Sequence, residues 1–158
     1  MSLVFVYADE REIDRARIEL EAQDQIARGE VVLLRTGVGK VRTTMEITRY
    51  LSSTIRAGRS RPIIVNIGTC AAVVPGLLGE VVRPAQAIDR DGVHERLLAA
   101  KIPPPPPVDL ASPDARNLVI ASGDSFMTEV DEADTLASLG VSLVDMETHS
   151  VGWATQKG

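Results

Sequence analysis

The sequence is poor in cysteine, histidine and aromatic residues, and each scarcity narrows what the protein can be. Its 158 residues include one cysteine, Cys70, and two histidines, while Phe, Trp and Tyr together make up 3%. A single cysteine excludes an internal disulfide and is typical of a reducing cytoplasm, where we expect this chain. With so few aromatic residues the core must be aliphatic, which is feasible because 44% of the residues are hydrophobic.

Two classes of partner are disfavoured by what is lacking. No apolar run approaches the ~20 residues of a membrane span, so we expect no membrane partner. No block of Lys or Arg stands out and the formal net charge is −5, which disfavours binding to nucleic acid. The length predicts one domain, residues 1–158, and leaves small molecules as the expected partners.

The chain alternates apolar runs of β type with segments of helical spacing. Strands are expected at residues 2–7, 30–36, 62–67, 80–82, 117–121 and 141–144, with a short strand and turn at 85–91. Helices are expected to begin near Ile13 and to span residues 41–56, 93–100, 130–139 and 150–158. A strand-then-helix order repeated along the chain predicts an α/β fold.

The stretch 143–150 joins the last expected strand to a helix and carries two acids, Asp145 and Glu147, on either side of Met146. In open α/β sheets, ligands bind outside the carboxyl ends of the strands. A Glu there can accept two hydrogen bonds from a vicinal diol, such as the 2′- and 3′-hydroxyls of a ribose. The alternative is a helix cap, in which Asp145 caps the helix and Glu147 complements its dipole.

Three other expected strands end in residues suited to a ligand site. Glu12 lies in an acidic turn after the first strand, and the small residues 68–72 follow the strand 62–67. Small residues let backbone amides approach a ligand closely. Phe126 lies in a loop after the strand 117–121, where its ring can stack on a planar base. The alternatives are a solvated helical turn, a close-packed crossover and a loop anchor, respectively.

The string Gly-Val-Gly-Lys at 37–40 invites comparison with phosphate-binding loops but fails both tests. A P-loop requires Gly where Leu34 stands and Ser or Thr where Val41 stands. The dinucleotide fingerprint requires a third Gly where Arg42 stands. A tight strand-to-helix turn is the better interpretation.

Other reactive residue types are better explained without a catalytic or metal-binding role. Cys70 lacks a Cys-His signature, so a small buried thiol is favoured over a nucleophile. Asp89, Asp91 and His94 cluster in the sequence, but neither His94 nor His149 stands at a metal-ligand spacing. We therefore expect no metal site and no cofactor.

Four segments, taken together, resemble one known family. They are 34–41, resembling "SGIGKV"; 65–72, resembling "INTGSAGG"; 121–126, resembling "SGDAF"; and 144–147, resembling "VEME". In this order and spacing they resemble the nucleoside phosphorylase and nucleosidase superfamily. Within it, the chain is similar to the methylthioadenosine/S-adenosylhomocysteine nucleosidase branch and its short bacterial relatives.

The resemblance implies catalytic roles for two acids. Glu147 matches the residue that holds the ribose hydroxyls, and Met146 matches the one that packs under the ribose. Glu12 matches the acid that positions or activates the attacking water, with Thr69 beside the ribose and that water. A carboxylate near the sugar favours an oxocarbenium-like state, and a general base typically contributes ~10²–10⁴ in rate.

The same resemblance implies a substrate-binding set. Phe126 matches the aromatic residue that stacks on the purine, and Met127 offers backbone contacts to the base edge. Cys70, Ala71 and Asp145 complete the set of residues predicted to contact the substrate.

The implied activity is hydrolysis of the N-glycosidic bond of a purine nucleoside, with neither metal nor cofactor. Asn66 stands where the phosphorylase branch carries a phosphate-binding Arg, which favours water as the nucleophile. Two alternatives stay open: phosphorolysis, or a degenerate protein that binds a nucleoside without cleaving it. By analogy with the family, a homodimer or larger homo-oligomer is expected.

The implied architecture is a single three-layer domain with a central mixed, mostly parallel sheet flanked by helices. The family's next strand, whose Asp protonates the leaving purine, and its last helix have no counterpart before Gly158. We therefore expect a domain that is incomplete at its C-terminus. The segment 89–117 is also short and proline-rich for the family, which leaves the 5′ substituent of the substrate undefined.

Overall fold

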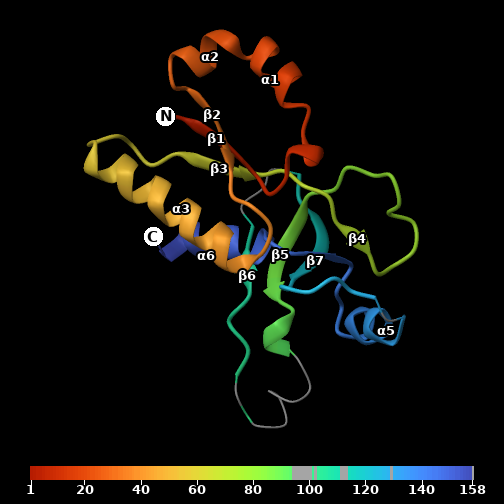
Figure 1. Cartoon of the computed structure of the whole chain (residues 1–158). Helices are drawn as coiled ribbons and strands as arrows, with labels where there is room; N and C mark the ends of the chain where they lie inside the picture. Colours follow the sequence, from red (N-terminus) through yellow and green to blue (C-terminus); the bar gives the residue numbers. More distant parts are fainter. Residues whose placement is uncertain (94–100, 102, 111–113, 129, 158) are drawn as a thin grey trace.

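The computed structural model describes residues 1–93, 101, 103–110, 114–128 and 130–157 (Figure 1). The strands are β1 (Leu3–Tyr7), β2 (Val31–Arg35), β3 (Ile63–Asn66), β4 (Ala71–Ala72), β5 (Pro84–Asp89), β6 (Val108–Asp109), β7 (Arg116–Ser122) and β8 (Leu143–Asp145). The α-helices are α1 (Arg15–Glu21), α2 (Gln23–Ala27), α3 (Lys40–Arg56), α5 (Val130–Ser138) and α6 (Thr148–Lys157). Two short 3₁₀ turns, η1 (Glu10–Glu12) and η2 (Asp91–Val93), follow β1 and β5.

The strands are mostly parallel and are flanked by helices, which confirms the predicted α/β class. β1 lies between β2 and β3 and is parallel to both. β5, β7 and β8 are also parallel to one another, and the two-residue strands β4 and β6 pair antiparallel at the edges. Hydrogen bonding divides these strands into two sheets, ordered β2-β1-β3 and β4-β8-β7-β5-β6.

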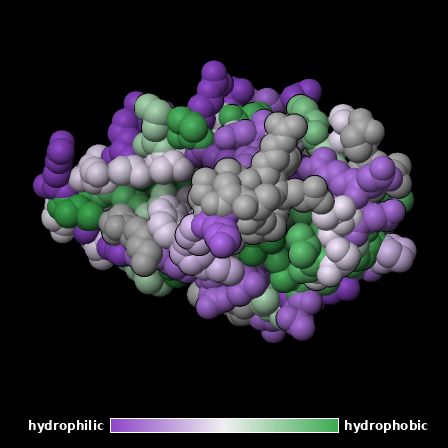
Figure 2. All heavy atoms as spheres, turned by 90° about the horizontal axis from the view of Figure 1, so that it is seen from below, coloured by the Kyte–Doolittle hydropathy of each residue, from purple (hydrophilic) through white to green (hydrophobic). Residues whose placement is uncertain are grey.

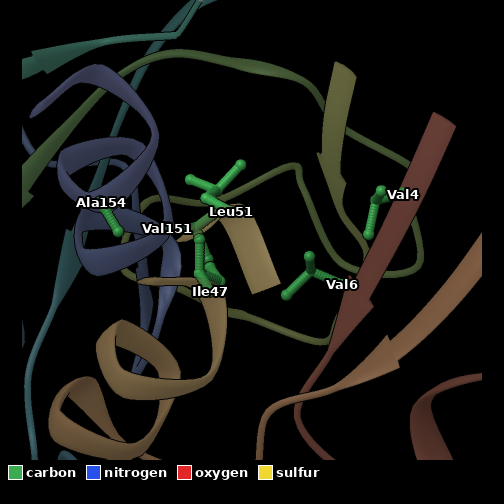
Figure 3. Packing of buried hydrophobic residues seen from close by; sticks show 6 residues of the cluster. All are labelled: Val4, Val6, Ile47, Leu51, Val151 and Ala154. Atoms are coloured by element: carbon green, nitrogen blue, oxygen red, sulfur yellow. The ribbon is translucent and has the colours of Figure 1, made fainter. Parts of the chain in front are cut away.

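The N-terminal sheet is covered by α3 and α6, which pack against each other (Figure 1). In α3 the buried side chains recur at helical spacing, namely Thr43, Ile47, Leu51 and Thr54. Figure 3 shows the aliphatic side chains of β1, α3 and α6 turned toward one another; they are Val4, Val6, Ile47, Leu51, Val151 and Ala154. This cluster anchors α6, and with it the Asp145–Glu147 junction that precedes the helix.

The second sheet has apolar side chains on both faces. On one face Ala87, Ile120 and Leu143 pack with Leu77 from the loop after β4. On the other face Ala121 and Val144 pack with Leu136 of α5. Because β7 and β8 are buried on both faces, their carboxyl ends, which carry Ser122 and Asp145, are held in fixed positions.

Most expected elements are found within a residue or two of their predicted bounds, but the strand at 80–82 is wrong. Residues 80–82 have no regular structure, and the side chain of Val81 is 97% exposed. They follow a loop in which Gly76 and Gly79 both adopt positive φ. Their β-type composition therefore has no neighbouring strand to pair with. The helix expected at 93–100 lies almost wholly outside the described residues.

The surface mixes polar and apolar side chains. Seen from below, hydrophilic and hydrophobic residues interleave over the visible face (Figure 2). Among the described residues, no helix is long and apolar enough to cross a membrane.

Candidate active site

A cleft of about 770 Å³ runs along the whole of β3 and beside α6, and one end of it lies at the carboxyl ends of β1, β3 and β8. Of the residues predicted from sequence, those that line it are Glu12, Thr69, Cys70, Asp145 and Glu147. They come from three different loops, so the fold brings together side chains that are far apart in sequence. The predicted residues outside its lining are Ala71, Phe126, Met127 and Met146.

Glu12 is fixed by backbone donors from two loops. Its Oε2 accepts hydrogen bonds from the amides of Ala8, at 2.9 Å, and Asp9, at 3.1 Å, and so closes a capping box on η1. Its Oε1 accepts from the Thr69 amide at 3.2 Å and from the Thr69 hydroxyl at 3.4 Å. A Cβ at Gly68 would lie 3.1 Å from Oε1, which explains the small residue there. The carboxylate thus joins the β1 and β3 loops.

Glu147 is a buried carboxyl group with one strong backbone donor. The residue is only 9% exposed, and its Oε1 accepts a hydrogen bond from the Gly39 amide at 2.8 Å. The pKa of Glu147 is raised to about 7, mainly by burial and also by the negative charges of Asp145 and Glu12, against the opposing effect of the Gly39 amide. Two acids from distant loops therefore act on one another electrostatically across the cleft.

The Gly-Val-Gly-Lys string has a role that its sequence did not reveal. Gly39 stands at the N-cap of α3 with φ +98°, a conformation that favours glycine. Its amide donates to a carboxylate of the protein itself, Glu147. A glycine at a helix N-terminus indicates an anion site, because its amide is free to bind one. The anion here is Glu147, which lies 108 positions away in the sequence.

Asp145 has both carboxylate oxygens occupied by protein groups. Its Oδ1 accepts from the Ser122 hydroxyl at 2.5 Å, and its Oδ2 accepts from the Thr148 amide at 2.9 Å and from the Thr148 hydroxyl. The Ser122 hydroxyl also accepts from the His149 amide at 2.9 Å. This is the helix-capping arrangement weighed as an alternative for Asp145, and it ties the end of β8 to the first turn of α6.

The loop after β3 presents Thr69, Cys70 and Ala71 at the surface. Thr69 contacts Glu12, and Ala71 pairs with Val144 in the β4–β8 ladder. Cys70 is exposed and not buried as expected. Partial desolvation, followed by the negative charge of Asp145, raises the pKa of its thiol. A raised thiol pKa disfavours the thiolate, so the structure offers no activation of Cys70 as a nucleophile.

The predicted base-binding residues lie on the loop after β7. Phe126 is 80% exposed, while Met127 is partly buried against the cluster under α5. Met146 is partly buried between Asp145 and Glu147. The Phe126 ring therefore faces solvent, and its position depends on the backbone of this loop.

A cluster of charged residues beneath that loop was not predicted. Lys40 Nζ lies 2.9 Å from Asp89 Oδ1 and 2.5 Å from Asp91 Oδ2. Burial alone would lower the pKa of Lys40, but the two carboxylates outweigh it and the pKa is raised. The guanidinium of Arg90 donates to the carbonyl and hydroxyl oxygens of Ser125. The sequence shows the alternation Asp89-Arg90-Asp91 at the end of a strand, but it does not show that Lys40 and Ser125 lie beside these residues.

This cluster also bears on metal binding. Asp89 and Asp91, considered with His94 as metal ligands, are paired with Lys40, and His94 lies outside the described residues. In the described part of the chain, no three His, Cys, Asp or Glu side chains converge as they would on a metal ion. The imidazole of His149 stacks on Trp153, with ring centroids 6.1 Å apart, and its Nε2 lies 3.2 Å from the Pro106 carbonyl.

The family model described as the phosphorylase superfamily matches residues 7–155. The chain belongs to the phosphorylase superfamily. The resemblance drawn from the four sequence segments is thereby confirmed, and so is the fold that it implied.

Solved structures of this superfamily share the fold at low sequence identity. A futalosine hydrolase mutant of Helicobacter pylori strain 26695 superposes with a TM-score of 0.70 at 18% identity, over 99% of this chain and 82% of that one. The 5′-methylthioadenosine/S-adenosylhomocysteine nucleosidase of Neisseria meningitidis, in complex with methylthio-immucillin-A, gives 0.72 at 17% identity, over 99% and 80%. An MTAN mutant of Helicobacter pylori with 5′-methylthioadenosine in its active site gives 0.66 at 18%, over 99% and 79%. A comparison with curated proteins finds no match.

Proposed function

We propose that the protein hydrolyses the N-glycosidic bond of a purine nucleoside. The observation that carries this proposal is the pair of carboxyl groups, Glu12 and Glu147, fixed on opposite loops of one cleft. Membership of the phosphorylase superfamily supports it. Two structural relatives, a futalosine hydrolase and a methylthioadenosine/S-adenosylhomocysteine nucleosidase, suggest the substrate class.

In this proposal the two acids have different tasks. The ionised Glu147 accepts hydrogen bonds from the ribose hydroxyls, each charged bond contributing about 1.5–3 kcal/mol, and its charge favours the positive sugar of the transition state. Glu12, held beside Thr69, takes a proton from the water whose oxygen bonds to the anomeric carbon. The C–N bond breaks as this bond forms, and the purine leaves with its electron pair and takes a proton from solvent water. The purine stacks on Phe126, with Met127 beside it, while Met146 packs under the sugar and Asp145 fixes the junction that carries Glu147.

Water is favoured over phosphate as the nucleophile. Among the described residues that line the cleft, the cationic ones are Arg61 and Arg83, which precede β3 and β5 and so lie at the amino ends of those strands. Asn66, close to the carboxyl end, donates its amide to the Thr148 hydroxyl at 2.9 Å. At the carboxyl end of the cleft, phosphate would therefore meet carboxylates with no cation among the described lining residues there.

The test is release of free base from methylthioadenosine, S-adenosylhomocysteine, inosine and futalosine, each with and without phosphate. We expect base and free ribose moiety without phosphate, no ribose 1-phosphate with it, and loss of release in Glu147→Gln. No release from any of the four substrates would remove the hydrolase proposal. Tight nucleoside binding by calorimetry without turnover would favour the degenerate binding protein instead.

The expected homo-oligomer is a separate proposal. Light scattering on the purified protein tests it: a mass near 17.0 kDa would contradict it. A mass of twice that value or more would support it.

A further inference from the structure

The loop that carries Phe126 needs an anchor that the ring itself does not supply. Phe126 is 80% exposed, so few protein atoms restrain its side chain. Stacking depends on where the ring is placed relative to the ribose, because a base can reach it only at one height above the sugar. The residues that fix the backbone of this loop therefore decide whether Phe126 can stack on a base.

Arg90, the residue after β5, contacts that loop directly. It is 5% exposed, and its Nη2 donates to the Ser125 carbonyl oxygen and, at 2.9 Å, to the Ser125 hydroxyl. A Cβ at Gly123 would lie 2.5 Å from Arg90 Nε, so the guanidinium packs directly on the Gly123 backbone. Its Nε also lies 3.7 Å from Glu132 of α5. The buried Arg90 guanidinium thus contacts the loop on both sides of Asp124, at Gly123 and Ser125, and also contacts α5.

A second set of contacts connects the loop to the ribose half of the site. The Asp124 amide donates to Asp91 Oδ2 at 3.0 Å, and Asp124 Oδ1 accepts from the Lys40 amide at 2.7 Å. The amide of the preceding residue, Gly39, donates to Glu147. The loop and Glu147 are therefore both held by the Gly39–Lys40 turn. Arg90 holds the part of the loop next to Phe126, at Ser125.

We propose that Arg90 is a positioning residue for the purine half of the site, acting through Ser125 to place the Phe126 ring. This inference rests on the proposed function, because it takes Phe126 to stack on the base. Arg90 touches neither base nor sugar in this assignment. Its charge satisfies the Ser125 carbonyl, which would otherwise lack this buried donor.

The experiment measures inhibition of the 158-residue protein by two product fragments, adenine and D-ribose, for Arg90→Gln and Arg90→Lys. Arg90→Gln is expected to weaken adenine inhibition about tenfold, as loss of base stacking would, and to leave ribose inhibition unchanged. Arg90→Lys retains a cationic donor for Ser125 and is expected to recover most of that loss. Arg116→Gln, which breaks an exposed ion pair with Glu80 at the opposite end of β7, is the matched control and should change neither constant.

A double variant separates positioning from a general structural role. In the Phe126→Ala background, Arg90→Gln should weaken adenine binding no further, because the ring it places is gone. An equal loss in both backgrounds, or an equal loss for adenine and ribose, would overturn the assignment. If Arg90→Gln fails to fold by circular dichroism, Arg90→Met, which fills similar space without a donor for Ser125, is put through the same cycle with the same criteria.

Failure of the proposed function gives a different result. If the wild type releases no base from any nucleoside, adenine and ribose binding are measured by calorimetry with the same variants. Adenine binding that depends on Arg90 only when Phe126 is present keeps this inference while the hydrolase is lost. Absence of adenine binding in the wild type sinks both.

Discussion

The two halves of the candidate site are built in opposite ways. The half proposed to bind ribose, around Glu147, is buried at the junction of a doubly covered strand and a helix, and its carboxyl group is held by a backbone amide. The purine half presents Phe126 on an exposed loop that is fixed from below by Arg90. The carboxyl group proposed to handle charge is therefore held rigidly, whereas the exposed ring proposed to stack on the base keeps more freedom to adapt.

Replacing Glu12, the proposed catalytic base, should have the largest effect. Glu12→Gln keeps the size of the side chain but cannot accept a proton from water, so kcat should fall by ~10²–10⁴. Steady-state base release measures this. Glu10→Gln, on the same turn but in exposed ion pairs with Arg15 and Arg35, is the control and should leave kcat unchanged. A fall of less than threefold in Glu12→Gln would assign the base elsewhere.

Glu147 should make the protein less stable as the pH rises. Its pKa is about 7 in the folded state against an ordinary value of 4.5, so the folded protein holds this proton more tightly than the unfolded chain. The resulting stabilisation is complete below pH 4.5 and is lost as the pH rises through 7, by about 3 kcal/mol in all. Urea unfolding of wild type and Glu147→Gln across this range measures it. A difference between the two proteins that does not vary with pH would contradict a buried, proton-holding Glu147.

The same group should control substrate affinity with the opposite dependence on pH. If ribose binds the ionised carboxylate, the KM of the nucleoside should fall about thirtyfold between about pH 5.5 and about pH 8, with its midpoint near the Glu147 pKa. As Glu147 loses its proton, the stability of the fold would then fall while the affinity for the nucleoside rises. Glu147→Gln, assayed for nucleoside binding by calorimetry, should show no such midpoint. A midpoint that persists in this variant would assign the proton to another group.

The sequence was sufficient to predict that Glu12 and Glu147 line one cleft, because the pattern that places each acid is local. Glu12 and Glu147 each follow a short apolar run, and the carboxyl ends of parallel strands converge whatever the details of packing. The strand at 80–82 failed for the converse reason, since β-type composition forms a strand only where a partner strand lies alongside. Strand identity was predictable where burial on two faces enforces it, as in β7 and β8.

What the sequence could not supply were contacts between distant positions. The Gly39 amide and Glu147 are separated by 108 residues, and Arg90 and Ser125 by 35. Each partner looked ordinary in its own surroundings: a turn glycine, an acid in a first helical turn, an arginine between two aspartates. Their meaning depends on tertiary placement, which no local periodicity encodes.

Replacing Asp145 tests whether this residue caps α6 or contacts the substrate. Because Ser122 and Thr148 occupy both of its oxygens, Asp145→Asn should lower the free energy of unfolding by about 1–2 kcal/mol through loss of the charged cap on α6. Loss of its negative charge should also lower the pKa of Glu147 and shift the midpoint of the KM profile below 7. Thermal unfolding and the pH profile measure the two effects. A large rise in KM with unchanged stability would show that Asp145 contacts the substrate directly.

Cys70 should give the smallest effect, although it lies in the cleft beside the reactive groups. Its thiol pKa is raised by partial desolvation and by Asp145, so the thiolate needed for nucleophilic attack is scarce at neutral pH. Cys70→Ser should therefore leave kcat within about twofold of wild type, because a hydroxyl of similar size still fits a position that needs only a small side chain. Alkylation with iodoacetamide should be slow at neutral pH and should accelerate as the pH is raised, in parallel with thiolate formation. Loss of turnover in Cys70→Ser, with Glu12 and Glu147 intact, would show that the loop after β3 contributes chemistry and not only space.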